Sequence, residues 1–181
     1  YSQKKSTKYY NEKGIEISKS NFRKSINYKK NLEAYFEDDT SKSYILISRS
    51  VVGKLKPKEF NALKNHLNEI SGFKIDTTKF IVINYLSKTP KKSENTKHRS
   101  SWNVLDTDYL KKLHKIGNIQ QYSINDPKND NLKYYHINKI NWLADEGNII
   151  KNMFFPYEIR YGNFVIIRPS GVFVYYLGEH S

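Results

Sequence analysis

The residues best suited to chemistry follow an apolar run, FIVINYL at positions 80–86, where the sequence turns abruptly basic and polar. The segment 87–101 then precedes a helical pattern, so this loop would connect a strand to the start of a helix. Backbone N–H groups and the helix dipole there would favour a phosphate, sulfate or carboxylate. The simpler interpretation is a long solvated loop, because surface loops often carry charge. Its basic residues are Lys88, Lys91, Lys92, Lys97, His98 and Arg99.

The sequence contains no cysteine, which excludes several kinds of chemistry from these 181 residues. Thiol nucleophiles, disulfide exchange, thiolate-bound zinc and iron–sulfur clusters all need that sulfur. The serines near His98 lie in no Gly-x-Ser-x-Gly elbow, and sequence neighbours seldom form a catalytic triad. The histidines show no His-x-x-x-His or His-Glu-x-x-His spacing, so the sequence predicts no metal site and no cofactor.

Basic residues outnumber acidic ones, 31 to 18, and give a formal net charge of +13. Such a charge suits an acidic partner, because a basic face releases counterions when it meets a polyanion. Nucleic acid is the less favoured partner, since readout of bases and clamping of phosphates favour arginine over lysine. Solvated lysine faces are the simpler interpretation. The only arginines are Arg23, Arg49, Arg99, Arg160 and Arg168.

Length and composition predict a globular chain with one substantial core. Hydrophobic residues make up 38% of the 181 residues and aromatic residues 14%, which separates the chain from disordered sequences. No apolar run approaches the roughly 20 residues of a membrane-spanning helix. The sequence begins with YSQKKSTK and no methionine, so we expect a processing site nearby and favour a periplasmic or secreted location.

From residue 43 onward, patterns typical of strands and helices alternate. Strands separated by helices predict parallel pairing, and a closing pair of strands predicts an antiparallel hairpin. Carboxylates at Asp106 and Asp108 suit a helix start better than a catalytic pair. The expected elements are strand 43–51, helix 57–71, strand 80–86, helix 102–116, strand 118–126, helix 140–154, and two strands within 163–178 joined by a turn at Pro169–Gly171.

Residues 1–42 are expected to form an N-terminal extension on a main domain of residues 43–181. The run KYYNEKGIEIS predicts two short strands around a turn at Asn11–Gly14. The run SKSNFRKSINYKKNLEAYF predicts a helix over 18–36, with Ser18 or Ser20 as its cap.

The main domain resembles the thioredoxin-like family in the run FIVINYL and in the closing run YGNFVIIRPSGVFVYYLG. In that family a central strand enters a Cys-x-x-Cys loop that opens a helix, and a cis-proline precedes the final hairpin. The resemblance places the dithiol near Pro90–Ser93 and the cis-proline near Gly162, so this chain lacks both motifs. It implies an α/β fold: a three-layer thioredoxin-like sandwich whose mixed sheet ends in a C-terminal hairpin. Serine cannot replace the thiol, because an alcohol forms no exchangeable disulfide.

The sequence therefore favours a redox-inactive binding or structural module over an enzyme, an inference from fold analogy. Its partner would be a protein, peptide or anionic ligand that contacts the face corresponding to the family's active site. The alternative is a basic protein that binds polyanions, either nucleic acid or acidic polysaccharide. The expected ligand-binding residues are Thr89, Pro90, Lys91, Lys92, Ser93, Arg99, Tyr161, Gly162 and Asn163.

Overall fold

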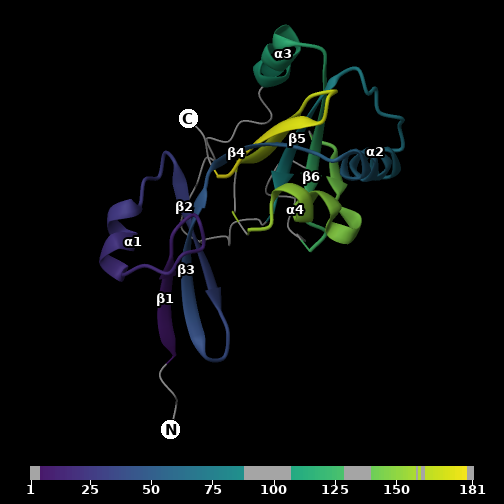
Figure 1. Ribbon diagram of the computed structural model, residues 1–181. Coiled ribbons are helices and arrows are strands. Elements are labelled where there is room, and N and C mark those ends of the chain that lie inside the picture. Colours follow the sequence, from purple (N-terminus) through teal and green to yellow (C-terminus); the bar gives the residue numbers. More distant parts are fainter. Residues whose placement is uncertain (1–4, 88–106, 129–139, 158, 160–161, 179–181) are drawn as a thin grey trace, which may run out of the picture. The chain divides into compact units, whose positions relative to one another are not determined.

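The computed structural model of the protein describes residues 5–87, 107–128, 140–157, 159 and 162–178. The chain divides into two compact units, an N-terminal unit of Tyr1–Val51 and a C-terminal unit of Val52–Ser181. The described residues form two mixed sheets and four α-helices, which confirms the expected α/β class (Figure 1). No helix among them is long and apolar enough to cross a membrane.

The N-terminal unit is a three-stranded sheet with one helix. Strand β1 (Ser6–Tyr10) runs parallel to the middle strand β3 (Ser41–Ser48), and β2 (Asn31–Glu37) pairs with β3 in the antiparallel direction. A row of aromatic rings crosses the sheet because Tyr9, Tyr44 and Tyr35 are opposite one another in the register. Phe22 of helix α1 (Lys19–Ser25) packs on this row, with its ring centroid 5.2 Å from that of Tyr9. Of these four aromatic residues Phe22 is the buried one, and it joins Ala34, Leu46 and Ile47 in the unit's core.

The helix expected over 18–36 is only partly correct. Ser18 does cap α1, since its hydroxyl accepts a hydrogen bond from the backbone N–H of Asn21 at 3.2 Å. The helix ends at Ser25, however, and residues 31–37 form strand β2. The physical reason is local: Asn27 and Asn31 bind neighbouring backbone groups and hold a turn between the two elements. Of the two short strands expected around Asn11–Gly14, the first is β1 and the second is reduced to a single bridge between Tyr10 and Glu16.

The strand expected at 43–51 corresponds to β3, which pairs within the N-terminal unit and not with the larger sheet. The division between the two units accordingly falls after Val51. The boundary suggested by the sequence alone was after residue 42. The first strand of the larger sheet is instead β4 (Ser50–Lys54).

The C-terminal unit contains a six-stranded sheet in the order β4-β9-β8-β5-β6-β7. Strands β5, β6 and β7 are parallel to one another, whereas β8 is antiparallel to both β5 and β9. Its elements after β4 are α2 (Pro57–Ser71), β5 (Phe80–Leu86), α3 (Thr107–Ile116), β6 (Ile119–Asn125), β7 (Trp142–Ala144), a short 3-10 turn (Glu146–Asn148), α4 (Ile149–Phe154), β8 (Asn163–Ile167) and β9 (Val172–Tyr176).

Strand β5 lies inside this sheet, between β6 and β8, as its continuous apolar sequence predicted. Every residue from Ile81 to Leu86 is buried. The closing hairpin is also confirmed: Gly171 takes a φ of 79°, a conformation that favours glycine, and the N–H of Arg168 donates to the carbonyl of Val172 at 2.8 Å. The two C-terminal strands thus pair as expected.

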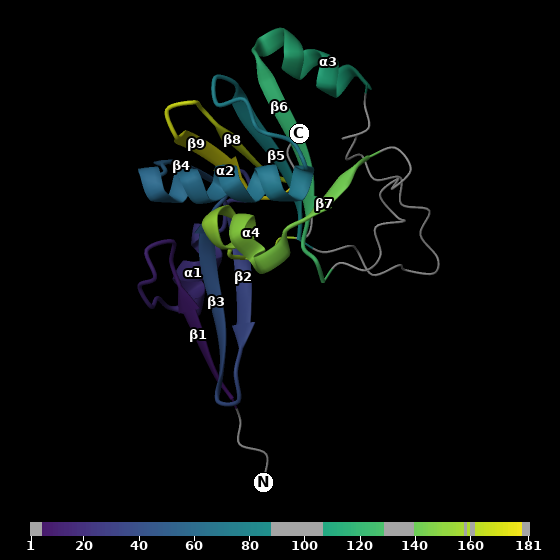
Figure 2. The ribbon, with the colours of Figure 1, turned by 90° about the vertical axis from the view of Figure 1, so that its right-hand side faces the viewer.

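Helices α2 and α4 lie beside each other on one face of the six-stranded sheet (Figure 2). Leu63 and Leu67 of α2 are fully buried, as are Ile150 and Phe154 of α4, so both helices pack their apolar sides into the core.

The helix expected over 140–154 is wrong in its first half. Residues 142–144 form β7, and α4 is confined to residues 149–154. Gly147 interrupts the helical path with a φ of 74°.

Candidate functional site

Most of the predicted ligand-binding residues lie outside the described part of the chain. Thr89, Pro90, Lys91, Lys92, Ser93, Arg99 and Tyr161 all fall there. Gly162 and Asn163 are described and buried, and Gly162 takes a positive φ of 70°. No peptide bond in the described ranges is cis.

Asn163 holds three parts of the C-terminal unit together and is itself fully buried. Its amide nitrogen donates to the hydroxyl of Ser87 at 3.2 Å and to the carbonyl of Ile159 at 2.7 Å. Its amide oxygen accepts from the backbone N–H of Gly178 at 3.0 Å. With its polar atoms used in this way, Asn163 joins the end of β5 to the start of β8 and the end of β9.

A buried carboxylate, Asp145, forms the centre of a second polar network in the same unit. Its side chain is fully buried, and one oxygen accepts from His66 Nε2 at 2.9 Å and from the N–H of Ile150 at 3.1 Å. The other oxygen accepts from the N–H of Lys151 at 2.9 Å and from the Tyr85 hydroxyl at 3.3 Å. Asp145 therefore joins α2, β5 and the start of α4 through one side chain.

The Tyr85 hydroxyl takes part in this network as a donor. Burial raises its pKa, and the negative charges of Asp145 and Asp126 and the hydrogen bond to Asp145 raise it further. A phenol with a raised pKa keeps its proton at neutral pH and cannot act as a base there. We interpret Tyr85 as a structural donor to Asp145.

A second buried carboxylate, Asp126, follows the end of β6. Lys151 Nζ donates to its Oδ2 at 2.6 Å, and its Oδ1 accepts from the backbone N–H of Lys128 at 3.0 Å. Asp126 and Asp145 both come directly after parallel strands, at the edge of the sheet where α/β proteins often bind ligands. Here, however, the carboxylates are occupied by protein donors, and no group of three or more potential metal ligands occurs among the described residues.

Replacing Asp126 with asparagine should lower stability at neutral pH and have much less effect in acid. Burial acts to raise the pKa of Asp126, but its hydrogen bonds to Lys151 and Lys128 and their charges outweigh burial and bring it below the ordinary value of 3.8. A carboxyl group with a lowered pKa stabilises the fold above its unfolded-state pKa and loses that contribution as pH falls through the folded pKa.

Urea unfolding of both proteins at about pH 6 and about pH 2 measures this contribution. The difference between the wild type and D126N should shrink as the pH falls. An equal difference at both pH values would contradict the ion-pair explanation.

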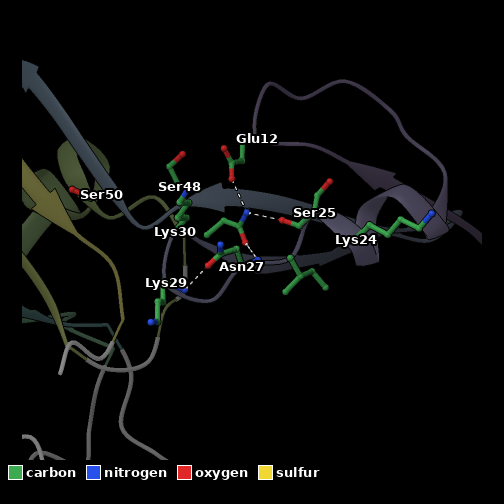
Figure 3. Close-up of a pocket in the computed structure, with 10 residues that line it drawn as sticks. Glu12, Lys24, Ser25, Asn27, Lys29, Lys30, Ser48 and Ser50 are labelled. Carbon is green, nitrogen blue, oxygen red and sulfur yellow. Dashed lines mark hydrogen bonds between the residues drawn. The ribbon is translucent and has the colours of Figure 1, made fainter.

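The N-terminal unit contains a polar pocket with a volume of about 630 Å³ (Figure 3). The pocket is bordered by the end of α1 and the loop that follows it, by Ser48 at the end of β3 and by Ser50 at the start of β4. Ile26 is its one apolar lining residue, and no aromatic side chain lines it. The charged lining residues are Glu12, Lys24, Lys29 and Lys30.

Asn31 fixes the wall of this pocket. Its side chain is nearly inaccessible and donates to Glu12 Oε1 at 2.7 Å and to the carbonyl of Ser25 at 3.0 Å. Its amide oxygen accepts from the N–H of Asn27 at 2.8 Å, and the N–H of Lys30 donates to the Asn27 carbonyl at 2.7 Å. The loop is therefore held by the hydrogen bonds of the buried Asn31 side chain, while Lys29 and Lys30 are exposed.

Sequence reasoning found neither this pocket nor the Asp145 network. The asparagines at 27 and 31 were a readable signal for the turn, because asparagine side chains commonly bind nearby backbone groups. His66 and Asp145 are 79 residues apart, and no spacing in the sequence connects them. Comparisons with protein families, with curated proteins and with solved structures found no match for the chain.

Proposed function

We propose that the protein is a redox-inactive binding module whose C-terminal unit has a thioredoxin-like fold. Three features of the fold support this proposal. Strand β5 lies inside the sheet, it pairs in parallel with β6 across the connection that contains α3, and β8 and β9 form an antiparallel hairpin on its other side. This is the arrangement that the resemblance implies for a central strand and a closing hairpin.

The observation that carries the proposal is the exit of β5. The strand ends at Leu86, and the next residue, Ser87, is buried with its hydroxyl accepting from Asn163. A dithiol site in this fold would open just beyond that point, and the chain has no cysteine to place there. The neighbouring carboxylates Asp126 and Asp145 are held by protein donors. We interpret these carboxylates as groups that stabilise the fold and not as catalytic groups. The role that we propose for the protein is therefore binding.

An insulin-reduction assay with added dithiothreitol tests the redox-inactive part of this proposal. We expect the rate with the protein to equal the rate of dithiothreitol alone, because disulfide exchange requires a thiolate. A thioredoxin standard in the same buffer shows that the assay detects catalysis. A rate above the dithiothreitol background would contradict the proposal.

A second candidate function, binding of polyanions, is favoured by the pocket of the N-terminal unit. Three lysines line it, and the whole chain has a net charge of +13. We expect retention on a heparin column, with a dissociation constant that rises steeply with salt because bound counterions are released. Titrations at several salt concentrations measure this slope. Binding without a salt slope would remove the candidate.

A further inference from the structure

The loop between α1 and β2 presents charge from a fixed backbone. Lys29 and Lys30 are exposed, whereas the adjacent Asn31 is buried and makes hydrogen bonds with both its amide nitrogen and its amide oxygen. A loop already held in one conformation loses little entropy when a ligand binds. The backbone that carries Lys29 and Lys30 is thus already ordered before a ligand binds, and only the exposed lysine side chains need to adjust.

The positive charges around the pocket are spread out and do not meet at one point. In Figure 3 the side chains of Lys24 and Lys29 extend toward opposite sides of the pocket. A small ion such as a single phosphate needs several donors converging on it. Separated ammonium groups instead suit a ligand that carries several negative charges along its length.

The pocket also contains groups that suit hydroxyls. Glu12 lies in the lining, and its Oε1 accepts from Asn31 Nδ2. Its second oxygen has no donor among the described residues and can accept from a ligand. The serines Ser25, Ser48 and Ser50 add hydroxyl groups to the same lining. A carboxylate that repels anions is a poor feature for a purely electrostatic site, but it is a good acceptor for sugar hydroxyls.

Nucleic acid fits this pocket less well. Proteins that bind single strands usually stack bases on aromatic side chains, and no aromatic residue lines the pocket. We therefore propose that the pocket bordered by Glu12, Lys24, Lys29 and Lys30 binds an acidic polysaccharide, with lysines contacting its sulfate or carboxylate groups and Glu12 accepting from its hydroxyls. The proposal rests on the polyanion-binding candidate and adds to it a site and a ligand class.

Two pairs of lysine variants test the location of the site in the full chain. K29Q/K30Q removes two charges at the pocket, and the control K111Q/K112Q removes two exposed charges from α3. We expect K29Q/K30Q to weaken binding to heparin about tenfold and to lower the salt slope, while the control stays close to the wild type. Equal losses in the two double variants would overturn the assignment to the pocket.

The substitution Glu12→Gln separates sugar recognition from simple charge attraction. If charge alone drives binding, removing this carboxylate should strengthen binding to any polyanion. If Glu12 accepts from sugar hydroxyls, E12Q should weaken binding to heparin and to polygalacturonate, because an amide oxygen is a weaker acceptor than a carboxylate. Tighter binding by E12Q would overturn the proposal.

The choice of probe identifies the ligand class and the kind of acidic group. We expect heparin or polygalacturonate to bind more tightly than oligothymidylate of matched charge, and the stronger of the two sugars shows whether sulfate or carboxylate is preferred. Tighter binding of oligothymidylate would overturn the polysaccharide assignment while leaving polyanion binding intact. If none of these probes binds, both the polysaccharide assignment and the polyanion-binding candidate are wrong. The insulin assay tests the redox-inactive module independently of that result.

Discussion

Replacing Asp145 with alanine should lower the free energy of unfolding by about 3–5 kcal/mol, the range for breaking a buried charged network by removing one partner. Its carboxylate is fully buried and accepts from His66, Tyr85 and two backbone N–H groups at the start of α4. Alanine would leave the donors of His66, Tyr85 and Ile150 buried without an acceptor, and the half-buried N–H of Lys151 would lose its acceptor as well. Urea unfolding followed by circular dichroism measures the loss.

The matched control is Asp76→Ala. Asp76 also accepts hydrogen bonds, from the hydroxyl and N–H of Thr78, but 42% of its side-chain surface is exposed. Water can replace the lost acceptor there, so the effect should be far smaller.

A double-mutant cycle with His66→Ala completes the test. The D145A and H66A losses should add to more than the loss in the double variant, because both remove the same interaction. A D145A protein as stable as D76A would show that the network contributes little.

Replacing Phe155 with alanine should lower the free energy of unfolding by about 3–5 kcal/mol, as expected when a buried aromatic ring leaves a cavity. Phe155 is fully buried, and its ring stacks on that of Tyr85 with centroids 4.9 Å apart. Its ring centroid also lies 6.1 Å from that of Phe154 and 6.3 Å from that of Tyr175. Few neighbours in such a cluster can move to fill the space.

Two further phenylalanine variants serve as controls for F155A. Phe73→Ala removes the same ring from a position that is 78% exposed, and it should change stability little. Phe155→Leu keeps part of the volume and should fall between the wild type and F155A. A small loss for F155A, similar to that of F73A, would mean that the ring is not part of a close-packed core.

The elements of the C-terminal unit were predictable where the sequence pattern was strong and local. Helix α2 has apolar residues at helical spacing, Pro57 in its first turn and a left-handed Gly72 just past its end. Strand β5 is apolar on both sides because it is covered on both faces. The β8–β9 hairpin has a turn that glycine favours at Gly171.

Predictions failed where the hydrogen bonds of a polar side chain or the conformation of a glycine, and not the apolar pattern, determined the secondary structure. The apolar spacing over 140–154 is compatible with a helix, but Asp145 gathers donors from several elements and Gly147 turns the chain before α4 begins. Similarly, Asn31 ends the helical tendency after α1 through hydrogen bonds made in the folded state. The bonds from Asp145 to His66 and Tyr85 join residues far apart in the sequence, so no window of sequence shows them. The bonds from Asn31 to Asn27 and Ser25 are local, and there the asparagines themselves were the signal that the apolar pattern lacked.

The candidate site was likewise predictable only in part. The charge of the chain suggested an anionic partner, but its predicted location, the loop 87–101, lies outside the described residues except for Ser87. The pocket in the N-terminal unit instead brings together residues from position 12 to position 50, and only the fold makes them neighbours.

The parallel pairing of β1 with β3 has a consequence for the order in which the protein is made. The ribosome releases β1 before its partner β3, which runs to Ser48, so β1 cannot pair with β3 until α1, β2 and β3 have emerged. Strands β2 and β3 are consecutive and can pair at once. We therefore expect β1 to be the last strand to join this sheet during translation.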